Sequence, residues 1–137
     1  MREILFRGKR LDNGEWVEGY LCKTVKHLET CHQNVVVDCI EVYDGGSYLN
    51  IVFRNVDPTT VGQYTGLTDI GGKRLFEHDV VTAKFKNNGA RYNFKVIYKD
   101  GGYMFHNGSV AVRFDQIRSA RKIGNIHDNP EMLEAET

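Results

Sequence analysis

Turn signals recur along this chain at short intervals, and they limit the folds open to it more than any other feature. Asp12-Asn13-Gly14, Asn87-Asn88-Gly89 and Asp100-Gly101-Gly102 each separate segments rich in β-branched and aromatic residues. Asn-Gly pairs readily take the positive φ angles of tight hairpin turns. Residues 90–98 alternate aromatic or β-branched with mostly polar side chains, as a half-buried strand does. The sequence therefore predicts a mainly β protein, a compact β-barrel or sheet fold of short strands.

Two Asx-Pro pairs predict short helices in this mainly β chain. Asp57-Pro58 and Asn129-Pro130 each place a capping side chain directly before a proline, which suits the first position of a helix. The helix near Pro58 would be short because Gly62 follows it, and the helix after Pro130 would run to about Ala135. The length suits one domain, 1–137, and a change of composition near 57–62 allows two subdomains.

Charge and cysteine content restrict the class of protein. Lys+Arg and Asp+Glu both number 18, so the formal net charge is zero, which argues against a DNA-coating protein or a polybasic membrane binder. No apolar run approaches the ~20 residues that cross a bilayer. The three cysteines are an odd number, and the first residues mix charge into their apolar run. We therefore expect reduced thiols, no membrane contact and a cytoplasmic location.

Glu77, His78 and Asp79 are three consecutive ionisable residues before an apolar strand. Carboxylate and imidazole groups suit a metal site or an acid/base pair. Neighbouring residues on a strand point to opposite faces, however, so His78 would oppose the two carboxylates. We therefore favour a structural role, in which a carboxylate accepts hydrogen bonds from backbone N–H groups at the strand entry. No catalytic residue and no metal ligand is expected here.

Cysteine and histidine also gather between residues 22 and 39. The spacing Cys-x8-Cys-x7-Cys lacks the short knuckle of a zinc site, so free thiols are expected. No nucleophile elbow and no phosphate-binding loop is present in the sequence, and no cofactor is predicted. The candidate zinc ligands are Cys22, Cys31 and Cys39, with His27 and His32.

Basic residues cluster near both ends of the chain. Such residues, beside aromatic side chains, suit a small β-barrel nucleic-acid-binding module. The zero net charge instead favours ordinary solvated charge, so nucleic-acid binding is the alternative function and not the preferred one. The candidate contacts are Arg7, Lys9, Arg10, Arg118, Arg121 and Lys122.

Four stretches of the chain occur in an order that is typical of one family. They are REILFRGKRLDNGEWVEGYL, VDPTTVGQYTGLTDIGGKRLFEHDVV, YNFKVIYKDGGYMF and IGNIHDNPEML. Along nearly its whole length, and least in residues 22–50, the chain resembles the YopX family of phage and prophage proteins. Members usually have Glu-Gly-Asp where this chain has His78 in the middle, so either His78 adopts a left-handed conformation or the position never required glycine. The motif residues are Gln63, Tyr64, Thr65, Gly66, Leu67, Glu77, His78 and Asp79.

The resemblance implies a mostly β fold with an SH3-like barrel portion, self-association and a phage or prophage gene. It implies no reaction. We therefore expect a non-enzymatic accessory protein in the bacterial host cytoplasm, acting as a homo-oligomer or by binding an unknown phage or host protein. An enzyme would need Glu77 and Asp79 to meet a distant histidine, His106 or His127, in a cleft.

Overall fold

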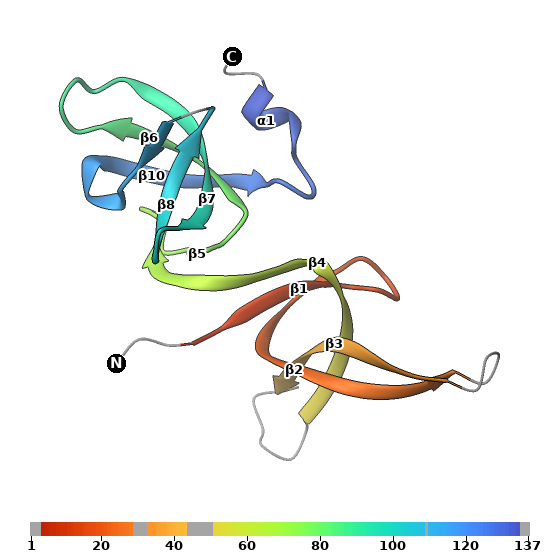
Figure 1. Cartoon of the computed structure of the whole chain (residues 1–137). Coiled ribbons are helices and arrows are strands. Elements are labelled where there is room, and N and C mark those ends of the chain that lie inside the picture. The colour runs from red at the N-terminus through yellow and green to blue at the C-terminus, as the bar shows by residue number, and fades with distance from the viewer. Residues whose placement is uncertain (1–3, 29–32, 44–50, 109, 135–137) are drawn as a thin grey trace. The chain divides into compact units, whose positions relative to one another are not determined.

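The computed structural model describes residues 4–28, 33–43, 51–108 and 110–134. Within these residues the chain is almost entirely antiparallel β-structure, which confirms the predicted mainly β class (Figure 1). The chain divides into two compact units, Met1–Gln63 and Tyr64–Thr137. The division falls just beyond the stretch 57–62 where the composition changes. Cys31 and His32 lie outside the described residues.

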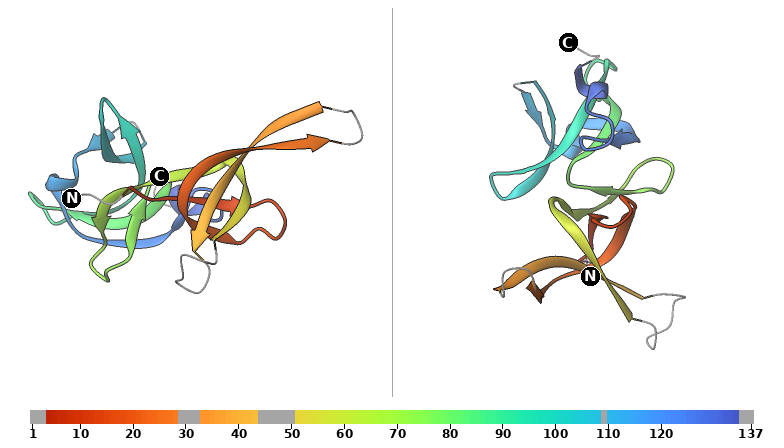
Figure 2. Two further views of the ribbon diagram at one scale, coloured as in Figure 1. Left: turned by 90° about the horizontal axis from the view of Figure 1, so that it is seen from below. Right: turned by 90° about the vertical axis from the view of Figure 1, so that its right-hand side faces the viewer.

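The first unit is a sheet that nearly closes on itself (Figure 2). Its strands are β1 (Phe6–Arg10), β2 (Trp16–Leu28), β3 (Gln33–Tyr43) and β4 (Ile51–Thr68), which continues into the second unit. They pair in this order, and β1 also pairs with β4. The predicted turn at Gly14, with φ 73°, connects β1 to β2. Ile40 and Val56 are fully buried, and a Cβ at Gly8 would lie 2.9 Å from the Val56 Cβ, so close packing requires glycine there.

The predicted helix at Asp57-Pro58 is wrong, because these residues lie inside β4. Asp57 Oδ1 accepts hydrogen bonds from the N–H group of Thr59 at 3.0 Å and from its hydroxyl at 2.8 Å. The capping carboxylate therefore stabilises a local turn. The pairing of β4 with β1 jumps from Gly62 to Asp57, which leaves Pro58 in a bulge. A bulge tolerates proline because the neighbouring strand does not need its missing N–H group.

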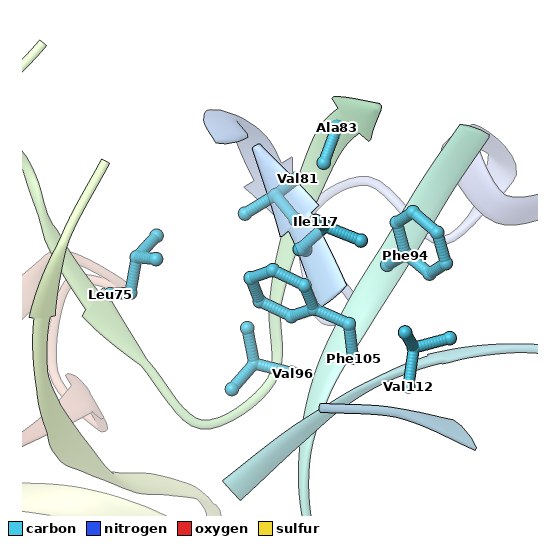
Figure 3. Packing of buried hydrophobic residues seen from close by; sticks show 8 residues of the cluster. All are labelled: Leu75, Val81, Ala83, Phe94, Val96, Phe105, Val112 and Ile117. Carbon is cyan, nitrogen blue, oxygen red and sulfur yellow. The ribbon is translucent and has the colours of Figure 1, made fainter. Parts of the chain in front are cut away.

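The second unit holds a five-stranded antiparallel sheet in the order β10-β6-β7-β8-β9. The 3-10 helix η2 (Phe114–Gln116) precedes β10, and β5 pairs with the end of β4. One face of the sheet carries the core, in which Phe105 lies among Val96, Val112 and Ile117 (Figure 3). The strands are β5 (Arg74–Phe76), β6 (Asp79–Phe85), β7 (Arg91–Lys99), β8 (Gly102–Asn107), β9 (Val110–Val112) and β10 (Ile117–Asn125).

The predicted C-terminal helix is not supported, since α1 is a single turn, Glu131–Glu134. Asn129 was expected to cap this helix. Its Oδ1 instead accepts a hydrogen bond of 3.4 Å from the N–H group of Asn125 at the end of β10. One turn gains few hydrogen bonds against the cost of helix nucleation. Among the described residues, no helix is long and apolar enough to cross a membrane.

Candidate functional site

The Glu77–Asp79 triplet forms the corner between β5 and β6. The N–H group of His78 donates to the Val96 carbonyl, and the His78 carbonyl accepts from the N–H group of Ile126, both at 2.9 Å. These two bonds hold the backbone of His78 at φ 78°, in the left-handed region. That conformation favours glycine and strains most other residues. The first of the two alternatives for His78 is therefore the one that the structure shows.

Asp79 is fully buried at the start of β6. Its Oδ2 accepts a 2.7 Å hydrogen bond from the N–H group of Phe76 and lies 3.1 Å from Nζ of Lys122. The Lys122 ammonium also lies 5.6 Å from the centre of the Phe76 ring. The carboxylate thus closes the corner between two strands and ties it to β10.

Asp69, in the glycine-rich loop between β4 and β5, plays a similar part. Its Oδ1 accepts from the N–H groups of Gly71 and Lys73, and its Oδ2 accepts from the N–H group of Lys122, all at 2.9 Å. Burial alone would raise the pKa of Asp69. The three backbone hydrogen bonds more than offset that burial, so the pKa is lowered from its usual value. Sequence reasoning missed Asp69, although an Asp before a Gly-Gly pair is a signal for a carboxylate-closed turn.

The structure brings His127 to the corner, where it meets the imidazole of His78. The His127 Nε2 and His78 Nδ1 atoms are 3.3 Å apart, and the rings are nearly perpendicular. His106 lies elsewhere on the sheet, opposite Lys95. Burial first, and then repulsion from Lys95 and Lys99, lowers the pKa of His106. In the part of the chain that the structure describes, no group of three or more His, Cys, Asp or Glu side chains could hold a metal ion.

The remaining motif residues, Gln63 to Leu67, lie in β4. Tyr64 is buried and packs against Phe76 with ring centres 5.6 Å apart, and the Arg74 guanidinium lies 5.8 Å from the Tyr64 ring. Gly66 has φ 91° and Thr65 is buried, whereas Leu67 is exposed. Gln63 pairs with Phe6 in the first unit. Three of the eight motif residues, Tyr64, Thr65 and Asp79, are therefore buried, and the others are half-buried or exposed.

Two of the cysteines are neighbours on adjacent strands of the first unit. Cys22 on β2 is directly opposite Cys39 on β3, and their Sγ atoms are 3.5 Å apart as free thiols. Cys39 is fully buried. Burial, and then the contact with Cys39, raises the pKa of the Cys22 thiol to about 11. Such a thiol stays protonated and weakly nucleophilic at neutral pH. The zinc hypothesis depended also on Cys31 and His32, which are outside the described residues.

The six candidate nucleic-acid contacts are divided equally between the two units. Arg7 is buried with its guanidinium 4.8 Å from the Trp16 ring, and Lys9 lies 5.8 Å from the same ring. Arg10 pairs with Asp12, which raises its pKa and lowers the pKa of Asp12. In the second unit, Lys122 is held by Asp79. Only Arg118 and Arg121 are exposed on β10, where the structure adds Lys84, Arg91 and Lys95 from neighbouring strands.

Comparison with known proteins places the chain by fold and family. No curated protein matches it. The crystal structure of protein EF1440 from Enterococcus faecalis is similar, with a TM-score of 0.54 and 23% sequence identity, over 97% of this chain and 99% of that one. At that identity the likeness concerns the fold. The family model described as YopX protein matches residues 5–134, so the chain belongs to the YopX family.

Proposed function

We propose that this chain is a non-enzymatic phage or prophage accessory protein that assembles with itself in the host cytoplasm. The arrangement around the motif supports a scaffold: the carboxylates of Asp69 and of the motif residue Asp79 hold backbone N–H groups and Lys122 inside the second unit. The family motif thus stabilises the fold, and binding falls to exposed side chains. A phage or host protein as partner is the other form of this proposal.

One observation carries the proposal of self-assembly. Tyr20 on β2 is directly opposite Glu41 on β3, and Glu41 is directly opposite Phe53 on β4. Directly opposed residues project to the same side of a sheet, so the three side chains form a row, which we call the aromatic row. Tyr20 is 48% exposed and Phe53 is 54% exposed.

Exposed aromatic residues are the side chains that interfaces favour most. Two of them about 10 Å apart across three strands, separated by one carboxylate, make an anchor pair on this sheet face. A two-fold axis through this face would bring the row of one copy against the row of another, since a two-fold interface uses the same patch twice.

We further propose that the second unit is the SH3-like portion. Its five strands run β10-β6-β7-β8-β9, and the 3-10 helix η2 lies directly before β10. In this arrangement the last strand, β10, returns beside β6, which is the first of the five strands in the chain. Small barrels of this kind often serve as recognition modules, which is an analogy at the level of fold.

Light scattering over a range of concentrations tests self-assembly. We expect the apparent mass to rise from that of one chain towards that of two, and the variant Tyr20→Ser/Phe53→Ser to remain monomeric. Both positions are exposed, so the variant should keep its fold within about 0.5 kcal/mol per position. A matched control, Tyr98→Ser/Val110→Ser, removes two exposed apolar side chains from the second unit. A wild-type protein that stays monomeric at every soluble concentration would contradict the proposal of self-assembly.

A further inference from the structure

Strand register gathers cationic side chains on one face of the second unit. Lys84 on β6 is directly opposite Arg91 on β7 and Arg118 on β10. Arg121 is opposite Thr82, which lies two residues before Lys84 on β6. Opposed residues, and alternate residues along a strand, share a face. We call the surface made by Lys84, Arg91, Arg118 and Arg121 the basic face.

The basic face lies on the side of the sheet opposite the core, where Val80 is also fully buried and the Asn93 side-chain amide donates to the Met132 carbonyl of α1. Val81 and Ala83, which alternate with Thr82 and Lys84 on β6, are fully buried in the core (Figure 3). On the opposite side, Arg91, Arg118 and Arg121 are exposed.

The face has no carboxylate to neutralise it in the strands that build it. β6, β7 and β10 together hold seven Lys or Arg residues and one acid, Asp79. Asp79 is buried on the core side, where it holds Lys122. Among the described residues, no ion pair joins any of the four cations of the basic face to a carboxylate. In a chain of zero net charge, this is a local separation of charge.

The neighbours of these cations favour phosphate over a protein partner. The positions between them on the same face are Thr82 and Asn93, both polar. Protein interfaces usually have an apolar centre with few charges, which this face lacks. Three of the four cations are arginines, whose planar fork fits phosphate oxygens. The three strands place Arg118, Lys84 and Arg91 across about 10 Å, enough to contact neighbouring phosphates.

We propose that the basic face binds the phosphate backbone of a nucleic acid without reading its sequence. The aromatic residues of β7, which are Tyr92, Phe94 and Tyr98, alternate with Arg91 and project to the other side of the strand, so no base-stacking platform from β7 accompanies these cations. Binding therefore rests on charge and is independent of sequence. The basic face contains no residue of the aromatic row, so a test of nucleic-acid binding and a test of self-assembly can fail independently of each other.

Fluorescence anisotropy with labelled 20-nucleotide DNA and RNA, single- and double-stranded, tests the proposal. Four phosphate contacts on a single strand predict a log-log salt slope of about −2.8, which is about 50-fold weaker binding at 200 mM than at 50 mM salt. The variant Arg118→Gln/Arg121→Gln should halve that slope and weaken binding at 50 mM salt. Its matched control, Arg113→Gln/Lys73→Gln, removes two exposed cations outside the face and should bind as the wild type does.

Three results would overturn the assignment. One is the absence of binding to all four nucleic acids at 50 mM salt. Another is an equal loss of affinity in the variant and in its matched control, which would show that only overall charge matters. The third is competition by poly-glutamate as effective as that by unlabelled DNA, which would assign the face to an acidic protein partner. Unfolding in urea checks that both variants keep the wild-type fold.

Discussion

Asp79→Ala is the substitution that most directly tests how the corner is built. The change removes the acceptor of the Phe76 N–H group and the ion-pair partner of Lys122, both inside the second unit. It also opens a small space at a fully buried position. The corner should therefore lose its tie to β10 and its closing hydrogen bond together.

The expected loss follows from these contacts. A buried N–H group left without its acceptor costs about 1–3 kcal/mol. Removing one partner of a buried ion pair costs about 3–5 kcal/mol, but the Lys122 side chain is 21% exposed and its ammonium can turn to water. Because Lys122 can recover water, we expect a total below the sum of the two lower limits, about 3 kcal/mol. With a urea m-value of about 2 kcal/mol per M, the unfolding midpoint should fall by about 1.5 M.

Urea unfolding followed by far-ultraviolet circular dichroism measures this loss, because the signal reports on β-structure. Asp115→Ala is the matched control, since the Asp115 side chain is 72% exposed beside Arg113 and its pair should contribute under about 1 kcal/mol. Lys122→Met should also lower the free energy of unfolding. The double variant should lose less free energy of unfolding than the sum of the losses in the two single variants. An Asp79→Ala midpoint equal to that of the wild type would refute the reasoning.

Three further predictions follow from the second unit and the thiol pair. Because the pKa of Asp69 is lowered on folding, its ionised carboxylate stabilises the fold fully above about pH 4, and this contribution is lost as the pH falls through the folded pKa. In Asp69→Asn, the free energy of unfolding should therefore fall less steeply with decreasing pH, as urea titrations at several pH values would measure. His78→Gly should be more stable than His78→Ala by about 1 kcal/mol, since only glycine takes φ 78° without strain, and equal melting curves would contradict this. In a Cys31→Ser background, Cys22 and Cys39 should react slowly with iodoacetamide at pH 7.5 and rapidly in urea, whereas fast native labelling would argue against a raised thiol pKa.

Local signals predicted the β class and the turns at Gly14, Gly89 and Gly101, all of which have positive φ. They failed at Asp57-Pro58 and at Asn129, where the capping side chain is present but accepts its hydrogen bond from a backbone N–H group outside a helix. A side chain that can cap a helix can equally accept a hydrogen bond from a backbone N–H group in a bulge or a turn. The pairing of neighbouring strands therefore decides which of these structures forms. The SH3-like barrel, self-association and the host location stay predictions.

The sequence by itself determined that this chain is β-structure punctuated by tight turns, since those preferences act within a few residues. It also marked the Glu77–Asp79 triplet and placed the chain in its family. Only the tertiary structure decided that Asp69 holds the N–H group of Lys122, 53 residues away, and that His127 meets His78. Likewise, the basic face depends on which residues of β6, β7 and β10 are opposite one another. A shift of register by one residue would send those cations to the core side, and the composition of the chain would be unchanged.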